Sequence, residues 1–106
     1  MHAGPSVIHH FLEGTADRDV DVLFSDDATV VDEGQTRRGR DAIRAWRAEV
    51  ASKYTYTTEV RAISNPEPGR YVVDGRITGD FPGGVADLSW DFTVAEDRIR
   101  RLVIAP

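Results

Sequence analysis

The sequence predicts an α+β domain in which a strongly curved, mostly antiparallel sheet carries three N-terminal helices on its concave face. Three observations support this prediction. Apolar residues recur at helical spacing near the N-terminus and again between Gly39 and Lys53, and from Tyr54 onward they alternate with polar residues. A long, twisted antiparallel sheet with helices on its apolar face curls into an open cone.

The bulk composition fits a single domain over residues 1–106, because a chain of this length buries roughly two thirds of its unfolded surface in one core. Hydrophobic residues make up 41% and charged residues 29%, which disfavours disorder. The net charge of −5 argues against non-specific binding to nucleic acid or to an anionic membrane, since both need a basic face. Two Arg-rich stretches, 37–40 and 98–101, could form a local positive patch, although acidic residues lie near both.

The chain contains no cysteine, so a disulfide framework, a thiolate metal site and a thiol nucleophile are excluded. No apolar stretch approaches the length of a membrane helix, and the first residues do not combine a basic leader with a long apolar run. We therefore expect a cytoplasmic protein.

Two helices are expected before the sheet. The first begins near Pro5 and Ser6 and buries Ile8 and Phe11, and its face continues through Val7, Leu12 and Thr15. His9 and Glu13, four residues apart on the opposite face, fit either a solvated surface or a metal pair. A second, brief helix, capped by Asp19, turns Val20, Leu23 and Phe24 inward, and Ser25-Asp26-Asp27 form a turn into the first strand.

The stretch from Ser25 to Trp46 organises the chain. It predicts a strand over 28–32, a turn at Gly34-Gln35, a short polar strand and an amphipathic helix over 39–53. If Val30 points into the core, strand alternation turns Asp32 the same way and places a carboxylate on the apolar side. The helix buries Ala42, Ile43, Trp46 and Val50 and turns its Arg and Glu residues outward, and the Trp46 indole N–H requires a partner such as a carboxylate.

Four strands in meander order are expected after Tyr54, over 54–64, 71–79, 85–94 and 98–104. Turns at 65–69, 80–84 and 95–97 separate them. The third strand alternates most clearly, with Ala86, Leu88, Trp90, Phe92 and Val94 on one face. The apolar faces meet the helices around a pocket, in which Gly75 leaves room, and the predicted substrate-binding lining is Phe11, Val30, Trp46, Tyr54, Tyr56, Val73, Leu88, Trp90 and Phe92, with Asp32 as the catalytic candidate.

The order of elements, with Phe24-Ser25-Asp26-Asp27-Ala28-Thr29-Val30-Val31-Asp32 and Gly39-Arg40-Asp41-Ala42-Ile43, resembles the nuclear-transport-factor-2-like superfamily, particularly its small SnoaL-like and ketosteroid-isomerase-like members. The resemblance covers nearly the whole chain. It implies a cone-shaped domain that carries isomerases, cyclases, dehydratases, epoxide hydrolases and proteins without a known reaction.

Asp32 matches the general base of the ketosteroid isomerases in this resemblance. The two hydrogen-bond donors that those enzymes direct at the enolate oxygen, a Tyr and a protonated Asp, fall on Phe11 and Trp90 here. Phe cannot donate a hydrogen bond, and Trp donates only its ring N–H, which counts against steroid isomerisation. Tyr54 or Tyr56 could supply a substitute hydroxyl.

The epoxide hydrolases of the superfamily use an Asp-Arg-Asp set, and Asp74, Arg76 and Asp91 have the matching residue types. Strand alternation places these three on the outer polar face, away from the pocket. The resemblance also suggests a homodimer through this face, in which Asp74, Arg76, Thr78, Glu59 and Arg61 would meet their own copies.

Two functions remain open from the sequence. In one, the domain binds a small hydrophobic molecule and Asp32 accepts a proton or activates water, as in an isomerase, cyclase or hydratase. In the other, Asp32 only satisfies backbone donors in its turn, and the domain is a non-catalytic ligand-binding or dimerisation module. No phosphate loop, Ser-His-Asp set or metal cluster is present in the sequence, so no cofactor is expected.

Overall fold

The computed structural model describes residues 5–13 and 20–106. The first helix, α1 (Ser6–Glu13), buries Val7, Ile8 and Phe11 as predicted. The second, α2 (Val20–Leu23), buries Val20 and Leu23. The predicted cap at Asp19 and the helical position of Thr15 lie outside the described residues. Phe24 is fully buried as expected, but it opens the first strand and does not end the helix.

The first strand, β1 (Phe24–Asp32), begins earlier than predicted, and the expected turn at Ser25-Asp26-Asp27 is wrong. These residues stay extended because Phe24 already pairs with Ile99, and the register then shifts before Thr29 pairs with Arg101. The next turn lies at Glu33-Gly34, one residue before the predicted position. Both residues have positive φ, 53° and 74°, as the tight hairpin turns that match strand twist require. The short strand β2 (Gln35–Arg38) follows.

Helix α3 (Arg40–Lys53) starts directly after β2. Gly39 makes this change of direction possible, because its φ of 88° suits glycine and its N–H donates to the Ala28 carbonyl at 2.8 Å. Ile43 and Trp46 are buried as predicted. The expectation that every Arg of this helix faces outward is wrong, because Arg47 is 7% exposed.

The four later strands form the predicted meander: β3 (Tyr56–Glu67), β4 (Arg70–Gly79), β5 (Val85–Ala95) and β6 (Arg98–Ala105). β3 begins later than predicted because the Tyr54 N–H still donates to Val50 and caps α3. It also extends into the predicted 65–69 turn as far as Glu67, so that the turn is reduced to Pro68-Gly69 and β4 begins directly after it. A register shift between Val60 and Ala62 moves Ile63 to the core side, so both Val60 and Ile63 pack against the core.

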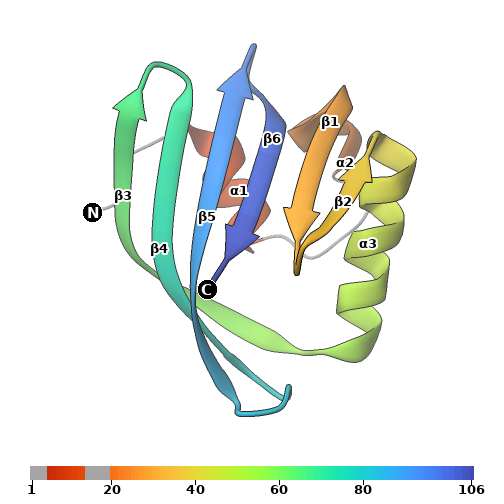
Figure 1. Cartoon of the computed structure of the whole chain (residues 1–106), viewed down its shortest axis with the longest axis vertical. Coiled ribbons are helices and arrows are strands. Elements are labelled where there is room, and N and C mark those ends of the chain that lie inside the picture. The colour runs from red at the N-terminus through yellow and green to blue at the C-terminus, as the bar shows by residue number, and fades with distance from the viewer. Residues whose placement is uncertain (1–4, 14–19) are drawn as a thin grey trace.

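The strands form one six-stranded sheet in the order β2-β1-β6-β5-β4-β3 (Figure 1). β1 and β6 are parallel and every other neighbouring pair is antiparallel. In the view of Figure 1, α1 and α2 lie behind the curved sheet and α3 lies beside β2. α3 packs on β1 and β2, while α1 and α2 contact β6. The predicted class, a curved and mostly antiparallel sheet with helices on one side, is confirmed.

Candidate functional site

Asp32 ends β1, where it pairs with Gln35 of β2 and with Ile104 of β6. Its carboxylate is half-buried and faces α3: the Trp46 indole Nε1 donates a hydrogen bond of 3.1 Å to Oδ2. The buried indole thus has the carboxylate partner that the sequence analysis required of it. This bond fixes one carboxylate oxygen, while the backbone of Asp32 is held by its two neighbouring strands.

The local sequence explains why these two side chains meet. The two-residue turn folds β2 back along β1, and α3 begins after the single residue Gly39. Because this connection is short, α3 runs beside β2 and packs on β1 and β2. Trp46 therefore lies over the end of β1, close to Asp32.

Arg47 is the site residue that the sequence analysis missed. Its guanidinium carbon lies 4.7 Å from the centre of the Phe11 ring, and its Nη1 atom is buried. The Phe11 ring also stacks on Trp46, with the ring planes at 10° and their centres 6.4 Å apart. A signal was present in the spacing, because position 47 is four residues after Ile43 and three before Val50, which places it on the apolar face.

Tyr56 lies close enough to sense both charged groups. Although 37% of the residue is exposed, burial raises the pKa of its hydroxyl above the usual value. The positive charge of Arg47 lowers that pKa and the negative charge of Asp32 raises it, with Arg47 the stronger of the two. A carboxylate, a guanidinium and a phenol thus share one neighbourhood, which we call the rim: Asp32, Trp46, Arg47 and Tyr56.

Tyr54 lies next to the rim and is 38% exposed. Its ring meets Phe81 edge to face, at 6.1 Å between centres. The hairpin that carries Phe81 is held by two hydrogen bonds, from the Thr55 N–H to Asp80 Oδ1 at 2.7 Å and from the Asp80 N–H to the Thr55 carbonyl at 3.1 Å. The β4–β5 hairpin and the start of β3 are therefore joined beside the rim.

The other predicted lining residues lie deeper. Six of the nine are less than a tenth exposed: Phe11, Val30, Trp46, Val73, Trp90 and Phe92. Leu88 is half-buried and packs against the same core. These side chains contact one another, as in the edge-to-face pair of Phe11 and Phe92 at 5.7 Å. Their role as a ligand wall stays a prediction, and Asp32, Tyr54 and Tyr56 are the polar residues of the predicted site that remain partly open to solvent.

Gly75 does not leave the space that the sequence analysis assigned to it. A side chain there would place its Cβ 2.5 Å from the Glu59 carbonyl oxygen and 3.2 Å from the Trp90 ring. The missing side chain lets β3 and the Trp90 ring approach the β4 backbone, which the strong curvature of the sheet requires.

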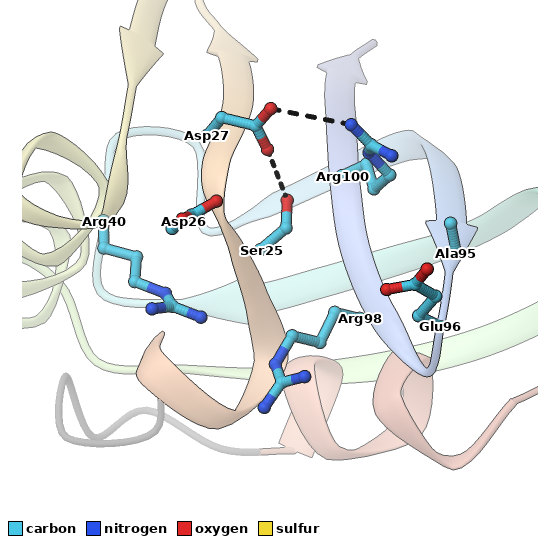
Figure 2. A pocket seen from close by; sticks show the side chains of 8 residues that line it. All are labelled: Ser25, Asp26, Asp27, Arg40, Ala95, Glu96, Arg98 and Arg100. Atoms are coloured by element: carbon cyan, nitrogen blue, oxygen red, sulfur yellow. Dashed lines mark hydrogen bonds and ion pairs between the residues drawn. The ribbon is translucent and has the colours of Figure 1, made fainter.

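Two hollows lie elsewhere on the surface. One, of about 330 Å³, opens between the start of β1 and the β5–β6 turn and contains charges of both signs, including an ion pair of 3.5 Å between Arg100 and Asp27 (Figure 2). The other, of about 280 Å³, lies around Arg70 and Asp91. Neither is lined by any of the predicted pocket residues.

The outer face of the sheet is polar, as the alternation predicted. Asp74, Arg76 and Asp91 do not act as a set there, because Arg76 binds Asp87 through two hydrogen bonds of 2.7 and 3.1 Å, and Asp91 binds Arg70 through two of 3.0 and 2.7 Å. The hydrogen bonds from Arg76 hold the pKa of Asp87 below its usual value.

Among residues 5–13 and 20–106, no group of three His, Cys, Asp or Glu side chains is arranged to hold a metal ion. His9 is half-buried and His10 is exposed. No helix in the described part of the chain has the length and apolar character needed to span a membrane.

No protein-family model and no curated protein matches the chain. Solved structures do. The chain is similar to a candidate polyketide cyclase from Sinorhizobium meliloti, with 28% identity and a TM-score of 0.86 over 96% of this chain and 95% of that one. A protein with a ketosteroid isomerase-like fold from Catenulispora acidiphila, solved with trimethylamine, gives 17% identity and a TM-score of 0.85 over 98% and 87%.

A candidate SnoaL-like polyketide cyclase from Jannaschia sp. gives 14% identity and a TM-score of 0.79 over 94% of this chain and 82% of that one. The resemblance drawn from the sequence is confirmed at the level of the fold: the neighbours are SnoaL-like and ketosteroid isomerase-like proteins.

Proposed function

We propose, starting from the SnoaL-like and ketosteroid isomerase-like fold, that this chain binds a small, largely apolar molecule at the rim and that Asp32 removes a proton from it or activates a water. The observation that carries the proposal is the 3.1 Å hydrogen bond from Trp46 to Asp32 Oδ2. It orients a half-buried carboxylate beside aromatic side chains and leaves the other oxygen, Oδ1, for a ligand. A positioned carboxylate of this kind is a general base.

The electrophilic partner also lies at the rim. An enolate that forms when Asp32 removes a proton requires a donor or a positive charge near its oxygen. The ketosteroid isomerase donors are replaced here by Phe11 and Trp90, and both are buried. Tyr56 lies within range of the charges of both Asp32 and Arg47, so these three groups can complete an acid and base arrangement of different composition. Structural neighbours at 28% identity and below support the fold and a small-molecule site but not one reaction.

The test is a reaction that needs only one base. 5-Nitrobenzisoxazole is flat and apolar, and removal of its C3 proton breaks the ring N–O bond and releases a coloured 2-cyano-4-nitrophenolate. We expect the chain to accelerate this reaction and Asp32→Asn to lower the rate about 100-fold, the usual contribution of a positioned base. Glu33→Gln is the matched control, because Glu33 is the neighbouring exposed carboxylate. Equal rates in the two variants would remove Asp32 from the mechanism.

A second candidate is a non-catalytic binding or dimerisation module, and the burial of six predicted lining residues favours it. Under this reading the Trp46 to Asp32 bond is purely structural. Native mass spectrometry of the purified protein separates the two. A co-purified small molecule supports the rim as a site, while an empty protein that also leaves 5-nitrobenzisoxazole unchanged supports the module.

The outer face supports a homodimer in either case. Arg61 lies between Glu59 at 3.4 Å and Asp87 at 3.7 Å, and Arg76 pairs with the same Asp87. Charges of both signs that alternate across strands can pair with their own copies around a two-fold axis. Sedimentation velocity at micromolar concentration is the test, and a monomer would contradict the dimer.

A further inference from the structure

Arg47 places a permanent positive charge on the apolar side of the sheet. The residue is 7% exposed, and its guanidinium stacks on Phe11 at 4.7 Å. A guanidinium is more weakly hydrated than an ammonium and stacks on aromatic faces, so it is the cation best suited to such a position. Stacking on the Phe11 ring holds the guanidinium in place within the rim.

The positive charge of Arg47 acts on Tyr56, an exposed residue of the rim. When Tyr56 ionises, its phenolate is an oxygen anion at the rim, and Arg47 stabilises that anion more strongly than Asp32 opposes it. The oxygen of a bound molecule at the same place experiences the same two charges. The Trp46 hydrogen bond to Asp32 offsets part of the opposing charge.

We propose that Arg47 makes the rim selective for small apolar ring compounds that carry one negatively charged oxygen, over neutral compounds of the same shape. This proposal rests on the proposed function, because it assigns the class of ligand held at the same site. The positive charge of Arg47 attracts a negatively charged ligand oxygen that lies near Tyr56. If that oxygen contacts the guanidinium, one of the five N–H donors of Arg47 can also bind it. Both effects are strong here because buried charges are poorly screened.

The experiment compares 2-naphthoate with 2-naphthamide, which share a ring system and differ in charge, by isothermal titration calorimetry on the full chain. We expect the naphthoate to bind about tenfold more tightly, the usual gain from one charge-assisted contact. Arg47→Met should abolish this preference, because it weakens the binding of the naphthoate. Asp32→Asn should increase the affinity for naphthoate, because it removes the opposing charge.

Arg44→Met is the matched control. Arg44 lies one turn earlier on α3, is one-third exposed and pairs with Asp21 and Asp41, so its loss changes the net charge equally without reaching the rim. It should keep the full preference for naphthoate. Should Arg47→Met fail to fold by circular dichroism, Arg47→Gln keeps a polar side chain without the charge and should lose the preference in the same way.

The outcomes separate the two proposals. If both compounds bind equally well to the unaltered chain, or if Arg47→Met keeps the preference, the selectivity is overturned while the site stands. If neither compound binds, the proposed function fails and the selectivity fails with it.

Discussion

Arginines on the two sides of the sheet differ in burial and in the groups that hold them. On the outer face, Arg70 and Arg76 each donate two hydrogen bonds to a carboxylate, and their side chains are 41% and 38% exposed. On the inner side, Arg47 is 7% exposed and stacks on an aromatic ring. Exposed pairs contribute little to stability, whereas a buried cation has a large desolvation cost. The comparison teaches that the outer arginines are held by carboxylates at the surface, while Arg47 is held inside the molecule against an aromatic ring.

The largest expected effect concerns the aromatic packing around Arg47. Phe92 is fully buried, and its ring contacts the Phe11 ring on which the Arg47 guanidinium stacks. Phe92→Ala should lower the free energy of unfolding by about 3–5 kcal/mol, through lost burial and the cavity that remains. Urea denaturation followed by circular dichroism measures it.

Val85→Ala on the same strand is the control, because Val85 is 47% exposed. It should change the free energy of unfolding by less than about 0.5 kcal/mol. A Phe92→Ala effect as small as that of the control would show that the inner side is loosely packed, and the contrast between the two faces would break.

The next effect tests the polar contact of the rim. A double-mutant cycle of Trp46→Phe and Asp32→Ala isolates the hydrogen bond between them. We expect a coupling of about 1–2 kcal/mol in the free energy of unfolding, because the acceptor is a charged and half-buried group. The cycle contains its own controls in the two single variants. A coupling near zero would mean that the indole and the carboxylate do not hold each other in solution.

Much of the fold was readable from the sequence because one side of each element is apolar. The alternation from Ala86 to Val94 predicted both faces of β5, and β2 confines α3 to the predicted position. Arg47 was missed because its charge was taken to decide its position, although its spacing from Ile43 and Val50 placed it on the buried face. The extended conformation of 25–27 depends on pairing with β6, a partner far along the chain that local turn residues do not reveal.

The packing on the inner side of the sheet also could not be predicted from the sequence. Alternation told which side chains point inward, but not that Trp90 would lie against the Gly75 backbone and use the space left there. The shift between Val60 and Ala62, which brings Ile63 to the core, is a response to sheet curvature, and local alternation does not predict it.

The smallest expected effect is on the outer face. The hydrogen bonds from Arg76 lower the pKa of Asp87, and the charges of Arg76 and Arg61 lower it further. A lowered pKa means that the pair stabilises the fold above the unfolded value near 3.8 and that this contribution is lost as the pH falls through the folded value. Asp87→Asn should therefore be slightly less stable than the unaltered chain at pH 7 and equal to it at strongly acid pH.

Thermal melts at several pH values, repeated in high salt, measure this difference, which salt should reduce. Asp74→Asn is the control, since Asp74 is exposed on the same face and has no ion pair within the described residues. A large and salt-insensitive loss in Asp87→Asn would mean that the outer pairs are buried in an assembly, and the two faces would then resemble each other.

The parallel pairing of β1 with β6 has a consequence for how the polypeptide folds. β2 and α3 can assemble on β1 through local contacts. The other edge of β1 pairs with β6, which follows β3, β4 and β5 in the chain. Pairings between such distant segments form slowly. Until β6 docks, β1 presents bare backbone donors and acceptors to any extended chain nearby. The same docking step brings Ile104 beside Asp32, so the surroundings of the Asp32 carboxylate are completed only when this edge of β1 is covered.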